Sequence, residues 1–590
     1  MRRAILLIIG FAIAIDSAPL FDETNADPNV PFNHPNLTAL KEGLAKLREK
    51  AERNHKNEEE NYNQDQLQNP ARRMPSVLQD GEYKEEDDDP IPDHLAKSQP
   101  ENAFGDSIIE TNEKSNLFDY LYQGDIILTE EQLQYKLSTL ENNDRDKRQA
   151  FTFYHPLYLW GKKVYYYFDI TATEKTKEVF RSAADFWQEN TCIDVIESAT
   201  ATNRIRVIKG LGCFSSVGVM KGVQDLSLGG GCESLGTAAH ELGHAIGFHH
   251  QQSRIDRDDF ITVSWQNIQD GKADQFVKET NDTNYNYDII YDYGSIMQYD
   301  AWSFSKNQNM TMKPRKKRYK MTMGSDIIAF YDILMLNLLY KCDEYCNPNT
   351  SAKCQNKGFP SPRNCSVCIC PSSFSSTLCD QRPDDGCGAT LEATEEWQYL
   401  NVSISGPENT TLKLDPIKCH WWITVTDEKK GIELQLIAYN TVGRLYGGCI
   451  WGEYVKCTRW VDLGVEFKTS QDQAKTGYRL CSMDGAANTT FKAYKSLAPV
   501  MVYSYRYQIN ATIRYRSFDG KIFGKVDPVN DNDRLDKHTT TTLKPKSTKK
   551  PKQKPADCFD QMADCGALAN YGYCSQPTYS EMCKKSCSMC

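Results

Sequence analysis

One short stretch of the chain carries residues that could bind a metal ion. It runs from His240 to His250 and contains the pattern H-E-x-x-H-x-x-G-x-x-H. Because residues four apart lie on one face of a helix, His240 and His244 can direct their rings at one ion. Gly247 can adopt the positive φ that ends a helix, which would let His250 approach as the third ligand. Three neutral imidazoles plus a water molecule are typical of a catalytic zinc site, because a structural site is closed by four protein ligands.

Glu241 lies one step round the same helix. It is close enough to the ion to take a proton from a bound water, so the pattern predicts metal-assisted hydrolysis with Glu241 as the proton acceptor. The alternative is an amphipathic helix whose histidines are satisfied by hydrogen bonds. Five matched positions in a chain with 10 histidines among 590 residues favour zinc.

A second motif, Ser295-Ile296-Met297-Gln298-Tyr299, lies about fifty residues downstream, where a metzincin Met-turn is expected. Together the two motifs resemble the astacin family of zinc endopeptidases, whose Met-turn reads S-I-M-x-Y. The resemblance implies that Met297 packs as an apolar floor beneath the zinc. It also implies that Tyr299 is an extra zinc ligand, which swings away during the reaction and donates a hydrogen bond to the oxyanion.

The composition indicates a secreted protein with several domains. A chain of 590 residues is too long for one hydrophobic core. Its 21 cysteines fall in distinct groups after residue 190, which suits an oxidising, extracellular compartment. The net charge of −10 argues against a general nucleic-acid binder.

The first residues have the pattern of a cleaved signal peptide, which we place at residues 1–17. Arg2 and Arg3 precede an apolar run from Ala4 to Ile15 that is too short to span a bilayer. No later stretch is apolar enough to cross a membrane, so we expect secretion. Sequons for N-glycosylation fit that route. They lie at Asn36, Asn281, Asn309, Asn349, Asn364, Asn401, Asn409, Asn488 and Asn510.

Residues 18–148 are predicted to be a propeptide. Residues 19 to about 115 are polar, acidic and free of cysteine, so we expect this stretch to be largely disordered. Tyr122-Gln123-Gly124-Asp125 resembles the astacin latency motif F-x-G-D, with Tyr in place of Phe. The resemblance implies that Asp125 binds zinc in the latent form and displaces the catalytic water.

The sequence Arg145-Asp146-Lys147-Arg148 is an R-x-K-R site for a furin-like convertase, so we expect cleavage after Arg148. In many astacins the new amino terminus folds inward to a Glu that directly follows the third His. This chain has Gln251 at that position, so the usual charge partner is missing.

Residues 149–342 are predicted to form one catalytic domain, an α+β fold that in the astacins has two lobes around a cleft. Residues 173–190 have helical spacing, residues 204–208 alternate like a strand, and residues 235–249 form the zinc helix. The resemblance implies two disulfides in this region, Cys192–Cys342 and Cys213–Cys232.

Residues 343–380 resemble an EGF-like module. The family pairing is Cys346–Cys365, Cys354–Cys368 and Cys370–Cys379, which sequence alone cannot prove. A zinc site is the alternative use of these cysteines, and the secreted context and the spacing disfavour it.

Residues 387–517 resemble a CUB domain, and the stretch Thr476-Gly477-Tyr478-Arg479-Leu480-Cys481 is typical of that module. The resemblance implies a β-sandwich of two sheets. Alternating runs such as 421–425, 432–436 and 500–503 indicate half-buried strands. The region has five cysteines, so one is left over; Cys387–Cys419 is the expected bridge.

A Thr/Lys/Pro-rich linker follows at residues 518–556. The tail, residues 557–590, resembles an ShK-type toxin module whose bridges would be Cys558–Cys590, Cys565–Cys583 and Cys574–Cys587.

The sequence therefore predicts a secreted zinc endopeptidase, made as a zymogen, that cleaves extracellular or matrix proteins. The modular organisation resembles nematode members of the family. Two alternatives stay open: a matrix-binding protein whose peptidase domain is inactive, and a secreted channel-directed toxin.

Overall fold

The computed structural model describes residues 34, 36–68, 108–141, 158–280, 283–405, 415–442, 463–481, 483, 486, 489–505 and 508–519. Within these ranges, no helix is long and apolar enough to cross a membrane. Several predictions fall elsewhere in the chain: the signal peptide, the Arg148 cleavage site, most of the linker, the ShK-type tail with its three bridges, and the sequons at Asn281, Asn409 and Asn488.

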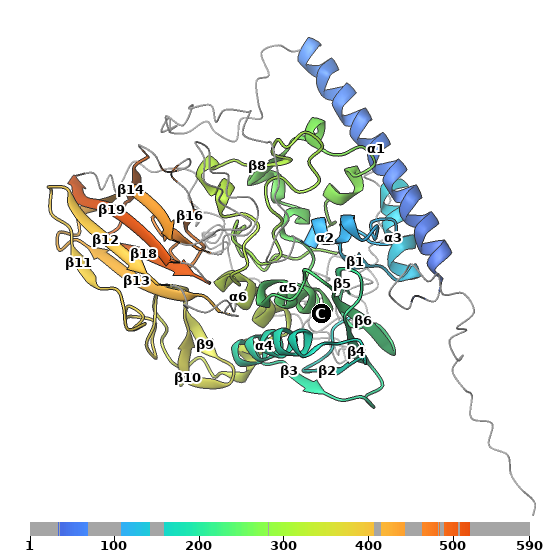
Figure 1. Cartoon of the computed structure of the whole chain (residues 1–590), viewed down its shortest axis with the longest axis horizontal. Coiled ribbons are helices and arrows are strands. Elements are labelled where there is room, and N and C mark those ends of the chain that lie inside the picture. Colours follow the sequence, from blue (N-terminus) through green and yellow to red (C-terminus); the bar gives the residue numbers. More distant parts are fainter. Residues whose placement is uncertain are drawn as a thin grey trace, which may run out of the picture. The chain divides into compact units, whose positions relative to one another are not determined.

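A six-stranded sheet forms one side of the catalytic region, with the strand order β1-β5-β6-β4-β2-β3 (Figure 1). All neighbouring pairs are parallel except β5 and β6, which are antiparallel. The strands are β1 (Ile126–Ile127), β2 (Lys163–Phe168), β3 (Asp194–Glu197), β4 (Arg204–Ile208), β5 (Cys213–Ser216) and β6 (Val223–Leu228). Strand β4 confirms the alternation seen in the sequence, because Ile205 and Val207 are fully buried.

Two helices, α4 (Glu174–Asn190) and α5 (Leu235–Ala245), pack together beside this sheet. Helix α4 begins at Thr173, whose hydroxyl accepts a hydrogen bond from the Thr176 amide at 3.2 Å. Its apolar face is buried in the core, as the spacing predicted. Trp187 is fully buried on this face, and its indole N–H donates to the Ala239 carbonyl of α5 at 3.2 Å. Helix α5 is therefore held in place by its packing against α4, which is itself anchored in the core.

The predicted zinc helix, residues 235–249, is too long. Helix α5 ends at Ala245, and Gly247 adopts a φ of 119°. The Phe248 amide then bonds back to the Gly243 carbonyl at 2.9 Å. This left-handed glycine turns the chain out of the helix, so that residues 248–250 lie beyond its end.

Residues 251–345, which follow the helix α5 and form the second lobe, have little regular structure. This lobe contains the antiparallel pair β7 (Ile261–Val263) and β8 (Met312–Pro314), helix α6 (Phe330–Leu339) and several short 3₁₀ helices. The 3₁₀ helices are η2 (Gln251–Ser253), η3 (Arg257–Asp259), η4 (Trp265–Asn267), η5 (Ala273–Phe276), η6 (Lys317–Met321) and η7 (Cys342–Tyr345). A cluster rich in aromatic side chains, including buried Tyr291, Tyr293 and Phe304, forms its core.

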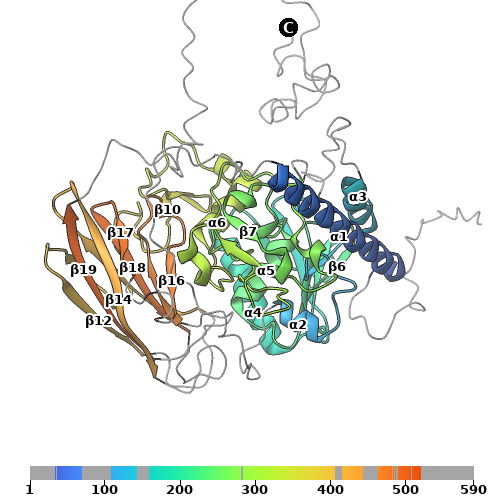
Figure 2. The same ribbon diagram turned by 90° about the horizontal axis from the view of Figure 1, so that it is seen from above.

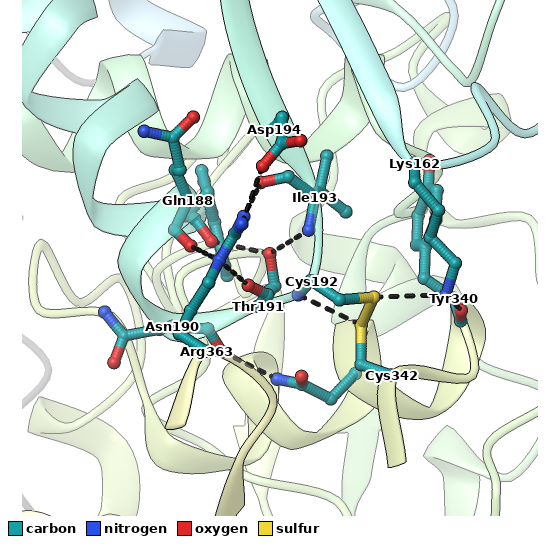
Figure 3. Close-up of a disulfide and its surroundings, with 12 residues drawn as sticks. Lys162, Gln188, Asn190, Thr191, Cys192, Ile193, Asp194, Tyr340, Cys342 and Arg363 are labelled. Carbon is teal, nitrogen blue, oxygen red and sulfur yellow. Dashed lines mark hydrogen bonds and ion pairs between the residues drawn. A yellow bond between two sulfur atoms is a disulfide. The ribbon is translucent and has the colours of Figure 1, made fainter. Parts of the chain in front are cut away.

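A small disulfide-rich module follows, built on the hairpin β9 (Phe359–Ser361) and β10 (Asn364–Ile369). Figure 3 shows how its Arg363 reaches the end of α4, close to the Cys192–Cys342 disulfide. The guanidinium donates to the carbonyls of Gln188 at 2.9 Å and Thr191 at 2.8 Å. A cation at the carboxyl end of a helix satisfies carbonyls that have no partner within the helix.

Six disulfides join pairs of described cysteines. They are Cys192–Cys342, Cys213–Cys232, Cys346–Cys365, Cys354–Cys368, Cys370–Cys379 and Cys387–Cys419. Cys481 is disulfide-bonded as well.

The residues from Thr390 to Asp519 form a β-sandwich, whose two sheets have the orders β11-β13-β18-β15-β16 and β12-β19-β14-β17 (Figures 1 and 2). Their facing side chains make one core. The last strand ends two residues beyond the predicted boundary at 517. The strands are β11 (Thr390–Glu392), β12 (Gln398–Ile404), β13 (Ile417–Thr424), β14 (Lys430–Val442), β15 (Leu463–Phe467), β16 (Tyr478–Leu480), β17 (Phe491–Ala493), β18 (Leu497–Ser504) and β19 (Gln508–Asp519).

The expected disorder before residue 115 is wrong for two stretches. They form helices α1 (Leu37–Gln68) and α2 (Ile108–Lys114), and a third helix, α3 (Glu130–Glu141), follows. Figure 2 shows α1 lying beside α3. The reason is a short apolar stripe, Leu40, Leu44 and Leu47, which is buried together with Leu133 of α3. The low average hydrophobicity of this region concealed the stripe. We call residues 36–68 and 108–141 the N-terminal segment.

Trp187→Ala is expected to destabilise the protein by about 3–5 kcal/mol, because it removes a fully buried indole and leaves a cavity beneath α5. Thermal unfolding of the full-length protein would measure the change. Ile170→Ala is the control, since Ile170 is 98% exposed and its loss should leave the unfolding temperature unchanged. Equal unfolding temperatures for the two variants would contradict this account of the core.

Candidate metal centre

Three histidine rings and one carboxylate meet at a buried point. His240 and His244 come from α5, and His250 follows the turn at Gly247. The Nε2 atoms of His240 and His250 each lie 3.1 Å from the Asp125 Oδ2 atom, and His244 Nε2 lies 3.6 Å from Oδ1. We call these four residues the metal centre. Their ligand-type atoms all lie within 4.8 Å of one another.

In two of the rings, the hydrogen-bond partner of Nδ1 determines which ring nitrogen carries the hydrogen. His240 Nδ1 lies 2.8 Å from the Ile296 carbonyl, and His244 Nδ1 lies 2.8 Å from the Phe248 carbonyl. A carbonyl oxygen can only accept, so each Nδ1 donates and each Nε2 of a neutral ring keeps its lone pair. Burial lowers the pKa of His244, and lowers that of His250 to about 3, so both rings are neutral at physiological pH.

This arrangement requires a cation. The Nε2 atoms of His244 and His250 lie 3.2 Å apart, and two lone pairs cannot form a hydrogen bond with each other. The nearby Asp125 carboxylate adds only further acceptors. Nitrogen and oxygen donors in this number suit zinc, and hydrogen bonds from the outer ring nitrogens to carbonyls are typical of zinc-bound histidines. The residues present therefore fit one zinc ion.

Glu241 is the one ionisable residue at a fixed position of the motif that lies outside this cluster. Its side chain is fully buried, and neither carboxylate oxygen has a hydrogen-bond partner among the described residues. Burial, and to a lesser degree the nearby Asp125, raises the pKa of Glu241 well above its usual range. A buried carboxyl without partners is costly to keep, so this one indicates a group that serves chemistry at the metal centre.

The end of α5 is held by partners that satisfy its last carbonyls. The His244 carbonyl accepts from the amides of Gly218 and Gly247, at 2.9 and 2.8 Å. The indole of Trp160 donates to the Ala245 carbonyl at 2.7 Å, and the Tyr340 hydroxyl donates to the Ile246 carbonyl at 2.9 Å. These contacts fix the turn that brings His250 to the metal centre.

The Met-turn lies against the same helix. An added Cβ at Gly243 would come within 3.1 Å of the Met297 sulfur, so the glycine allows this methionine to approach α5 closely. The Tyr299 hydroxyl donates to Asp125 Oδ2 at 3.1 Å and to the Gln123 carbonyl. Burial keeps the pKa of Tyr299 well above its usual value, so the phenol stays protonated.

Asp332 of α6 anchors the Met-turn, a role that the sequence alone did not reveal. Its carboxylate accepts from the Ser295 hydroxyl at 2.6 Å and from the Ile296 amide at 2.8 Å. The Ile296 carbonyl in turn holds His240. The β-sandwich supports the residues just before this turn, because Thr476 donates through its amide to Asp292 at 3.0 Å.

The N-terminal segment covers the metal centre. Its strand β1 pairs with β5, the edge strand of the catalytic sheet, in parallel orientation. The side-chain amide of Asn112 donates to the Cys213 carbonyl at 2.6 Å and accepts from the Cys213 amide at 2.8 Å, which copies a strand partner. Gly124 has a φ of 85°, and a Cβ there would meet Ile109 at 2.5 Å. This turn directs Asp125 inward. Sequence reasoning missed Asn112, because its partner lies 101 residues away.

Comparison with known proteins identifies close relatives. A family profile described as Astacin (Peptidase family M12A) matches residues 153–341. Zinc metalloproteinase nas-31 of Caenorhabditis elegans is 42% identical over 492 residues, which cover 82% of this chain and 74% of the relative. Zinc metalloproteinase nas-32 of the same nematode is 36% identical over 75% of this chain and 64% of its own length.

One solved structure is that of high choriolytic enzyme 1, a hatching enzyme zinc-protease from the medaka fish Oryzias latipes. It is 30% identical, with a TM-score of 0.29, over 30% of this chain and 89% of that one.

Replacing His250 by Ala should remove the bound zinc. The loss of affinity should exceed the roughly 10–100-fold that loss of an outer hydrogen-bond partner costs at such sites. His249→Ala is a matched control, because His249 is the neighbouring histidine and lies outside the metal centre. Metal analysis of the purified proteins by mass spectrometry would decide, and equal zinc contents in the two variants would exclude His250 as a ligand.

Proposed function

Because the chain belongs to the astacin family of zinc metalloproteases, we propose that it is a secreted endopeptidase made as a latent precursor. The observation that carries this proposal is Glu241, a buried carboxyl without a hydrogen-bond partner beside a site for one zinc ion. A zinc ion supplies a water with a pKa lowered to about 7 and polarises the peptide carbonyl.

Glu241 is the proton carrier of the proposed reaction. In the form seen here its carboxyl is shielded from water, and burial favours its protonated state. When Asp125 departs, a negative charge leaves the neighbourhood of Glu241 and water enters. The pKa of Glu241 then falls, and its carboxylate can accept a proton. It takes that proton from the attacking water and passes it to the leaving amine.

Tyr299 stabilises the transition state in this proposal. Its hydroxyl donates to Asp125 and to the Gln123 carbonyl, both on the N-terminal segment. When that segment leaves, the hydroxyl loses these acceptors. It can then donate to the oxyanion that develops at the scissile carbonyl.

Latency follows from the same contacts. The Asp125 carboxylate takes the place of a ligand beside the three imidazoles, and β1 and Asn112 occupy the edge strand β5, where a peptide substrate would pair. A furin-like convertase would cleave after Arg148 and release residues 18–148. The disulfide-rich module, the β-sandwich and the tail would then be EGF-like, CUB and ShK-type modules that bind extracellular proteins.

Glu241→Gln is expected to retain one zinc ion per chain and to lose peptidase activity by about 100- to 10,000-fold, the usual contribution of a general acid–base group. Casein digestion with and without a chelator, alongside metal analysis, would measure both properties. Glu178→Gln on the exposed face of α4 is the control for removal of a carboxylate. Wild-type protein that binds zinc but digests nothing would favour a matrix-binding protein with an inactive peptidase domain.

Asp125→Ala is expected to activate the uncleaved precursor. In a background with Arg148→Ala, which blocks processing, hydrolysis of a peptide substrate should rise at least about tenfold, the factor that 1.4 kcal/mol of lost contact represents. Glu49→Ala is the control, because Glu49 lies in the same segment, is 69% exposed and pairs with Arg53 of its own helix. A double variant as latent as the Arg148→Ala precursor would contradict the role of Asp125.

A further inference from the structure

Glu279 is a buried carboxylate whose main partner comes from the N-terminal segment. Both of its oxygens accept hydrogen bonds from the ammonium group of Lys136, at 2.5 and 2.7 Å, and the Glu279 side chain is fully buried. Although burial by itself opposes ionisation, Lys136 and then His249 hold the pKa of Glu279 at about 2, so the carboxylate is charged at neutral pH. The pair is therefore a buried ion pair between the catalytic domain and α3.

The Lys136 side chain is enclosed by groups from both sides of the interface between the N-terminal segment and the catalytic domain. Its ammonium group also lies 4.8 Å from the centre of the Tyr122 ring, and Tyr122 directly precedes the turn that carries Asp125 into the metal centre. Lys136 is only 12% exposed. The N-terminal segment thus places one aromatic ring and one cation next to Glu279.

Glu279 also lies close to the chemistry. Its amide bonds to the Ser253 carbonyl at 2.7 Å, and its carboxylate lies 3.6 Å from Nδ1 of His249, the neighbour of His250. A hollow adjoins this point and continues to the residue that follows strand β5. The N-terminal segment lines one side of it with Leu128, Gln132 and Lys136, and the catalytic domain lines the other with Val217, His249 and Thr283, among others.

Removal of the N-terminal segment leaves this carboxylate without its counter-charge. The contacts given by described residues outside that segment are the Thr283 hydroxyl at 2.6 Å and the His249 ring. A negative charge in a sheltered site, with its cation removed, favours binding of another cation. Val217, which directly follows β5, lines the same hollow as His249, so a peptide that pairs with β5 would lie near enough to Glu279 to supply one.

We propose that Glu279 selects substrates: after the N-terminal segment has left, it binds the ammonium or guanidinium group of a lysine or arginine side chain in the peptide, where Lys136 lies in the precursor. This proposal rests on the proposed peptidase function. It adds a substrate class, namely peptides with a basic residue at one fixed distance from the scissile bond.

The test compares peptide pairs in which one position after another carries lysine or its uncharged isostere, norleucine. The mature wild-type enzyme should cleave the lysine peptide with a kcat/KM about tenfold or more higher at one position, since loss of a buried charge partner usually has at least that effect. In Glu279→Gln the ratio should fall close to one. The absence of a lysine preference at every position in the wild type would overturn the proposal.

Two further variants separate charge from structure. Glu279→Asp keeps the charge and should retain the lysine preference, whereas Glu279→Lys should prefer glutamate at the same position. Glu197→Gln is the control, because Glu197 pairs with Arg181 on the exposed side of the catalytic domain and is about half exposed. An equal loss of preference in Glu197→Gln and Glu279→Gln would contradict a specific site.

A binding measurement distinguishes failure of this proposal from failure of the peptidase function. Fluorescence anisotropy of the same peptides on mature Glu241→Gln protein reports the lysine preference without any cleavage. If the wild type cleaves nothing but the lysine peptide still binds more tightly, the peptidase function is wrong and the site at Glu279 stands. If both peptides are cleaved and bound equally well, the peptidase function stands and the site does not.

Discussion

Three imidazole rings converge beside a carboxylate, and a bound cation satisfies all four groups. Several backbone and side-chain groups of the catalytic domain hold the three rings in this position. The carbonyls of Ile296 and Phe248 accept hydrogen bonds from the Nδ1 atoms of the first two rings. The left-handed Gly247 turns the chain so that the third ring lies beside them. Asp332 holds the backbone that holds His240. Because Ile296 and Phe248 also belong to the hydrophobic core, we expect metal binding and folding of this domain to be coupled.

The N-terminal segment contacts the groups to which we assign roles in the proposed reaction and in the proposed substrate site. Asp125 belongs to the metal centre, β1 and Asn112 pair with strand β5, and Lys136 neutralises a buried carboxylate. A second such pair joins Arg48 of α1 to the buried Asp274, at 3.5 Å. Each contact gives a partner to a polar group of the catalytic domain that would otherwise need another one.

Much of this site was predictable because it is local in sequence. His240, Glu241, His244, Gly247 and His250 lie within 11 residues, and the periodicity of a helix dictates which of them share a face. Alternating runs predict three of the nine strands described in the sandwich, β13, β14 and β18. Burial alternates in residues 421–425, at the end of β13, whereas residues 432–436 and 500–503 are buried throughout. The failures arise where composition averages over a pattern: α1 has few apolar residues, but Leu40, Leu44 and Leu47 lie on one stripe. The predicted zinc helix is too long, because the left-handed Gly247 ends it before residue 249.

The sequence by itself determined the chemistry, because ligand types and their spacing on a helix are properties of a few neighbouring residues. The tertiary structure alone decided which distant groups complete the site. Asp332, Asn112 and Glu279 act on partners 36, 101 and 143 residues away, and no local pattern encodes such a contact. Their roles arise from burial: a polar group removed from water must find a partner, and only the folded chain determines which partner lies within reach.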